Sequence, residues 1–83
     1  MSVKDILQFI LLELQKAIDD NSIERIHELC SAIDVLYEVA KSNKDKLALN
    51  ILDKMNYIVF HYDEDFSFVA DYLSDAQKMI SKL

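Results

Sequence analysis

The stretch VKDILQFILLELQKAI, residues 3–18, decides the fold of this chain. At about 100° per residue, a helix over this stretch places most apolar side chains on one broad face: Val3, Ile6, Leu7, Ile10, Leu11, Leu14, Ala17 and Ile18. Phe9 and Leu12 fall outside that face, among charged and amide side chains. One packing face cannot bury this whole set. The surplus must be covered by other helices of the chain or by a second molecule.

The composition favours helices throughout. The 83 residues include no glycine and no proline, which together make up roughly a tenth of an average globular sequence and concentrate at turns. A many-stranded fold without either residue lacks its usual hairpin turns. The hydrophobic content of 52% is too high for a disordered chain. We therefore predict one small all-α domain, residues 1–83. Its stability is marginal unless the packing is good or the protein oligomerises.

Polar residues that favour helix starts recur along the chain, at Ser2 and within residues 19–22, 42–43 and 63–65. Asn21 and Glu24 have the spacing of a capping box, and Ser42 with Asp45 is a weaker example. These signals predict four helices, at about residues 3–19, 22–41, 44–61 and 65–82, with boundaries uncertain by about two to four residues.

Each later helix also has an apolar face. The second carries Ile23, Ile26, Cys30, Ile33, Tyr37 and Ala40, widened by Leu29 and Leu36. The third carries Leu47, Ala48, Ile51, Leu52, Met55, Ile58, Val59 and Tyr62. The fourth carries Phe66, Phe68, Val69, Tyr72, Leu73, Ala76, Met79, Ile80 and Leu83. Short loops make sequential helices antiparallel. The expected architecture is an antiparallel up-down-up-down four-helix bundle. Completion or extension by homodimerisation, or by exchange of helical hairpins between two chains, stays open.

This topology separates the charges along the bundle. The first and third loops share one end, which gathers Asp19, Asp20, Asp63, Glu64 and Asp65. The second loop and both termini share the other end, which gathers Lys4, Lys41, Lys44, Lys46 and Lys82. Ordinary capping and helix-dipole preferences are the simpler explanation. The functional alternative is an acidic end that docks on a basic partner.

No motif predicts a metal or cofactor site. His27 and Cys30 are three residues apart, but no second pair completes a tetrahedral site and His27 lies outside the apolar face. Glu24 with His27 matches half of a di-iron signature, but the second half is missing. We expect Cys30 to be a buried, inert thiol and His27 to be solvated.

Calcium binding and nucleophilic catalysis are disfavoured in the same way. Asp63, Asp65 and Ser67 imitate the start of a calcium loop, but Phe68 replaces its glycine and Ser74 its final glutamate. No histidine has a recognisable nucleophile and acid near it in the sequence. We therefore expect neither an enzyme nor a cofactor.

Charge and cysteine usage limit the partners and the compartment. The net charge of −6 opposes binding to nucleic-acid phosphates and to anionic membrane surfaces. Lys4 and Asp5 precede the first apolar run and Glu13 interrupts it, so neither a signal peptide nor a membrane span of about 20 residues is predicted. Cys30 is the sole cysteine, which fits a reducing compartment. The expectation is a soluble, cytoplasmic protein.

Surface apolarity is the remaining functional signal. Leu49, Tyr57 and Phe60 are predicted to form a ridge on the outer side of the third helix, and Phe9 with Leu12 a second patch on the first. Single exposed apolar residues are ordinary, whereas contiguous ones with a polar rim more often mark interfaces.

These features predict a small non-enzymatic module that binds a partner protein, or itself as a homodimer, through apolar helix faces. Two alternatives stay open. One is an inhibitor bundle that neutralises a specific target, on the scale of bacteriocin immunity proteins and phage-encoded inhibitors. The other is a structural subunit that assembles only with itself. No motif is specific enough to assign the chain to either named group.

Overall fold

The computed structural model describes residues 2–63 and 66–83, and in these residues it contains helices and no strand. In chain order they are α1 (Val3–Asp19), α2 (Ile23–Ser42), α3 (Lys46–His61) and α4 (Phe66–Ile80). The all-α prediction is confirmed, with every observed helix boundary within two residues of its predicted position.

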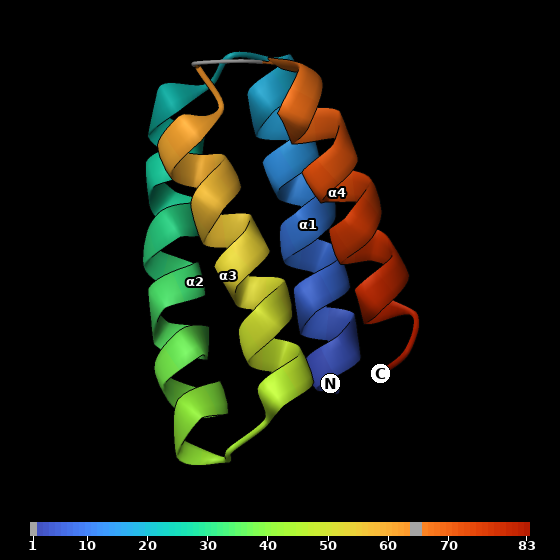
Figure 1. Ribbon diagram of the computed structural model, residues 1–83. Helices are drawn as coiled ribbons and strands as arrows, with labels where there is room; N and C mark the ends of the chain where they lie inside the picture. Colours follow the sequence, from blue (N-terminus) through green and yellow to red (C-terminus); the bar gives the residue numbers. More distant parts are fainter. Residues whose placement is uncertain (1, 64–65) are drawn as a thin grey trace.

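The helices form an antiparallel four-helix bundle, as predicted (Figure 1). α1 packs against α2 and α4, and α3 packs against the same two helices. The α1–α2 connection, the end of α3 and the start of α4 lie at one end of the bundle, and the α2–α3 connection lies at the other end with the start of α1 and the end of α4 (Figure 1).

The predicted apolar faces supply the core. The buried side chains are Leu7, Ile10, Leu11, Leu14, Ala17 and Ile18 of α1, Ile26, Leu29, Ile33 and Ala40 of α2, Ala48, Ile51, Leu52, Met55 and Ile58 of α3, and Val69, Ala76 and Ile80 of α4. All of them belong to the faces predicted from the sequence.

The faces are less complete at the ends of the helices. Ile23, placed in the core by its spacing, is 57% exposed, and Val3 and Leu83 are also exposed. All three lie at the end of a helix or just beyond it, where fewer neighbours surround a side chain than in the middle of the bundle. Cys30 is only partly buried. The side chain of Phe66 lies outside the described residues.

The first two connections share one backbone design. Asn21 and Lys44 have positive φ angles of 53° and 56°. After α1, the amides of Asn21 and Ser22 donate to the carbonyls of Ile18 and Ala17, at 3.1 and 2.8 Å. After α2, the equivalent bonds join Lys44 to Lys41 and Asp45 to Ala40, at 3.2 and 3.0 Å. Both sets form the Schellman motif, which normally has glycine at the left-handed position.

The helix starts differ from the predicted caps. Ser22 and Asp45 are the N-caps of α2 and α3, so the capping box predicted for Asn21 with Glu24 is wrong. Asn21 is instead the left-handed residue that ends α1, a conformation that asparagine tolerates better than most residues. The predicted pairing of Ser42 with Asp45 is also replaced, because α2 continues through Ser42. Ser2 caps α1 in a capping box with Asp5.

The left-handed residues give a stability prediction. Replacing Lys44 with glycine removes a steric penalty of about 1–2 kcal/mol, of which about half is offset by the greater freedom of glycine in the unfolded chain. Lys44→Gly should therefore raise the free energy of unfolding by about 0.5–1 kcal/mol in urea denaturation. Asn21→Gly is the control and should have a smaller effect. A destabilised Lys44→Gly variant would contradict this account of the turn.

The two N-caps allow a second, matched prediction. Ser22 and Asp45 have nearly the same backbone angles, with φ and ψ of −90° and 89° against −87° and 91°. The Asp45 carboxylate accepts from the Ala48 amide at 3.1 Å, whereas the Ser22 side chain makes no capping bond. Asp45→Ala should lower the free energy of unfolding by about 1 kcal/mol and Ser22→Ala by much less. Equal losses in urea denaturation would show that the capping bond is not the cause.

Candidate functional site

The two residues of the predicted α1 patch, Phe9 and Leu12, are both exposed but have different surroundings. Phe9 and Leu12 are 56% and 52% exposed. They are separated by about 60° around the helix axis. Leu12 lines a groove of about 370 Å³ between α1 and α4, and Phe9 does not. The sequence therefore identified two exposed side chains, of which only Leu12 lines this groove.

The groove between α1 and α4 has an apolar floor and an uncharged rim along most of its length. Its lining consists of Leu11, Leu12, Gln15, Ile18 and Asp19 from α1 and Val69, Ala70, Leu73, Ser74 and Gln77 from α4. Asp19 is the only ionisable member of this lining and lies at the end of α1. The groove is suited to an apolar side chain flanked by polar groups.

The predicted ridge on α3 is divided among three environments. Phe60 is 66% exposed and lines a hollow of about 240 Å³, together with Ile26 and Cys30 of α2. Tyr57 is 45% exposed and faces α4, where its ring stacks on Tyr72 with the centroids 5.0 Å apart. Leu49 is only partly buried and packs against the core. These three residues do not share one environment, and Phe60 remains the most exposed of them.

An aromatic cluster between α3 and α4 was not anticipated from the sequence. Tyr57 contacts His61 and Phe68, with ring centroids 4.3 and 5.4 Å apart, and Phe68 meets Tyr72 edge-on. Lys54 lies 4.8 Å from the centre of the Tyr72 ring and pairs with Asp75 at 3.9 Å. The available signal was the four-residue spacing of the aromatic side chains within each helix. The cluster joins α3 to α4.

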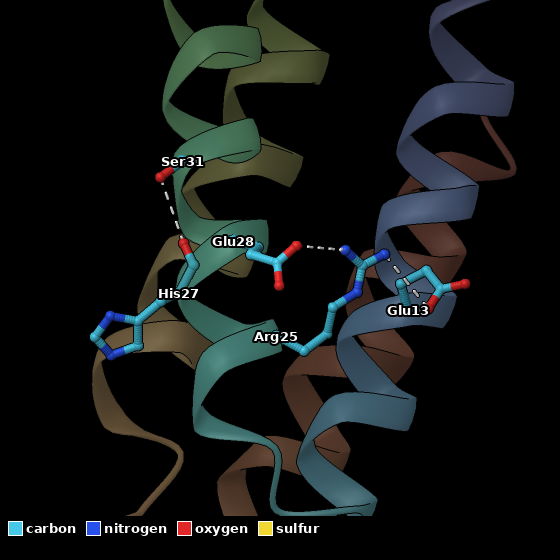
Figure 2. A network of polar contacts seen from close by, with 5 residues as sticks. All are labelled: Glu13, Arg25, His27, Glu28 and Ser31. Atoms are coloured by element: carbon cyan, nitrogen blue, oxygen red, sulfur yellow. Dashed lines mark hydrogen bonds and ion pairs between the residues drawn. The ribbon is translucent and has the colours of Figure 1, made fainter.

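Charged side chains link α1 to α2 on another face (Figure 2). Arg25 of α2 pairs with Glu13 of α1 at 3.7 Å and with Glu28 at 3.3 Å. Ser31 donates to the backbone carbonyl of His27, whose imidazole points away from Arg25 (Figure 2). Because the three side chains keep 25–59% of their area in contact with solvent, each ion pair contributes at most about 1 kcal/mol.

Three of the five residues predicted to form the acidic end lie within the described part of the chain. Asp19, Asp20 and Asp63 are exposed at the end that contains the first and third connections. Glu64 and Asp65, predicted to join them, lie outside the described residues. Within the described residues, no three His, Cys, Asp or Glu side chains are close enough together to hold a metal ion.

Cys30 lies in the hollow between α2 and α3, beside Phe60 and His27. Burial raises the pKa of its thiol, and the negative charge of Asp34 raises it further. The thiolate is the reactive form, so the raised pKa lowers the reactivity of Cys30 at neutral pH.

This shift predicts the alkylation behaviour of Cys30. At pH 8, iodoacetamide should modify the folded protein more slowly than the protein in urea, because less thiolate is present. Asp34→Asn removes the repulsive charge, lowers the pKa and should increase the rate in the folded state. Asp53→Asn, on another helix, is the control and should leave it unchanged. An alkylation rate that is unaffected by Asp34→Asn would contradict the role of that charge.

Comparison of the chain with protein-family models, curated proteins and solved structures finds no match. None of the helices in the described part of the chain has both the length and the apolar character required to cross a membrane.

Proposed function

We propose that this chain is a small non-enzymatic protein-interaction module, which binds a partner protein or a second copy of itself through apolar side chains on its outer helix faces. The observation that carries this proposal is Leu12, half exposed at the rim of the α1–α4 groove. All four helices already contribute buried side chains to the core, and the half-exposed Leu12 adds little to it.

Burial by a partner supplies the binding energy. Fully covering a leucine or phenylalanine side chain contributes about 1.5–3 kcal/mol of transfer free energy. Leu12 and Phe60 both lie beside hollows, where an incoming side chain would contact apolar groups on two helices. Large apolar side chains of this kind are typical of the centre of an interface.

The acidic end orients the partner in this proposal. Asp19, Asp20 and Asp63 form a negative surface at one end of the bundle. A basic partner would approach this end first, and the association rate would fall as salt screens the attraction. The apolar faces then determine how long the complex lasts.

The proposal is tested by placing a charge at each apolar position. Leu12→Lys or Phe60→Lys should abolish the self-association of the purified protein, or the capture of a specific partner from an extract of the cells that express it. Both side chains are exposed, so helical circular dichroism should be unchanged. The measurements are sedimentation over a concentration series and affinity capture with the two variants in parallel.

If the wild-type chain is monomeric and binds no protein whose retention depends on either side chain, the proposal is wrong. Loss of helical signal in Phe60→Lys would instead show that Phe60 belongs to the packed core.

A further inference from the structure

One stripe of residues along α1 has a symmetric pattern, so that the same stripe on a second, antiparallel helix would place opposite charges against each other. Its members are Lys4, Gln8, Leu11, Leu12, Gln15 and Asp19. They lie within about 100° of the helix circumference. Four of them, Leu11, Leu12, Gln15 and Asp19, line the α1–α4 groove, and Lys4 and Gln8 continue the same face toward the start of the helix. The spacing is symmetric about the midpoint between Leu11 and Leu12, with a glutamine and then a charge on each side. The two terminal charges are opposite in sign.

We infer that this face binds a second copy of the chain, with the two α1 helices antiparallel across a two-fold axis near Leu12. This proposal deepens the proposed function, because it names the partner that covers Leu12. In a two-fold interface, residue i of one copy meets residue j of the other and the reverse contact is also made. Lys4 then faces Asp19 of the second copy, and Gln8 faces Gln15. Leu12 of each copy lies over the groove of the other, whose floor includes the buried Leu11.

The signs of the two terminal charges support this arrangement. A helix dipole favours acidic side chains near the start of a helix and basic ones near its end. Lys4 lies in the first turn of α1 and Asp19 is its last residue, so each has the disfavoured sign. Among the described residues, the ion pairs involve neither of them. Local helix stability does not explain the signs of these two charges. Pairing between antiparallel copies does, because each charge then meets one of opposite sign.

The neighbouring surface of α4 is compatible with close approach. α1 and α4 lie side by side (Figure 1). The α4 residues that line the groove are Val69, Ala70, Leu73, Ser74 and Gln77, all of them uncharged and two of them small. Along the groove itself, from Leu11 to Asp19, no charged side chain of α4 therefore opposes a second copy.

The available area is also sufficient. A standard interface buries about 800 Å² on each partner, which is about 15% of the 5284 Å² surface of this chain. The bundle measures 32 × 23 × 20 Å, and one of its long sides supplies an area of that order. Self-pairing through a single face is thus within the size range of stable dimers.

Charge reversal tests the proposal directly. In a two-fold dimer, Lys4→Asp places two like-charged pairs in the interface, and so does Asp19→Lys. Each should weaken self-association by about tenfold or more in sedimentation equilibrium. The double variant K4D/D19K restores opposite charges and should return the dissociation constant close to the wild-type value. Each single change moves α1 toward the sign that its dipole favours, so unfolding of the monomer is not expected.

Matched controls lie on the other helices and on α1 outside the stripe. Lys41→Asp and Asp53→Lys make the same changes in net charge on α2 and α3 and should leave self-association unaltered. Phe9→Lys introduces a charge at an equally exposed position outside the stripe and should also have no effect, whereas Leu12→Lys should abolish pairing.

A wild-type chain that stays monomeric at millimolar concentration overturns this proposal, and so does a double variant as weak as the single ones. Either result leaves the proposed function standing if capture of another protein still depends on Leu12 or Phe60. If Leu12→Lys and Phe60→Lys alter neither pairing nor capture, the proposed function fails as well. Pairing that depends on Phe60 and is insensitive to charge reversal overturns only the α1 interface.

Discussion

The structure depends on burying the apolar stripes of four short helices against one another. No disulfide joins the helices, and most of the stability of a helix in a protein comes from packing its apolar face. Leu14, Ile33, Met55 and Ile80, one from each helix, are completely enclosed. The transfer of such side chains from water offsets the entropy lost in ordering the chain. A residue that has no place in these stripes must be covered from outside or remain in water.

The short connections between the helices make sequential helices antiparallel. Each of the first two connections ends one helix and caps the next within three residues, which leaves no room for a long crossover. Without glycine, Asn21 and Lys44 adopt the left-handed conformation that such tight turns need. The helix ends are therefore brought together in two groups. The acidic side chains near the first connection and the lysines near the second lie at opposite ends of the bundle for the same reason.

The first helix shows how one element serves two purposes. Its inner face buries Leu7, Leu14 and Ile18 in the core, and its flank leaves Leu12 in water beside α4. A bundle of this size has little interior, so most positions lie near a surface. A side chain on the flank is available to a second molecule without disturbing the core, which separates the requirements of binding from those of folding.

The sequence by itself determined the helices, their approximate ends and the residues that face the core, because the helical period is a local property of the chain. It also identified Phe9, Leu12 and Phe60 as exposed, since each interrupts a polar face. The environments of Leu49, Tyr57 and Phe60 were decided only by the tertiary structure. A helical wheel gives the angle of a side chain but not the position of the neighbouring helices. Packing set those positions, which turned Tyr57 toward α4, left Phe60 beside α2 and placed Leu12 at the groove.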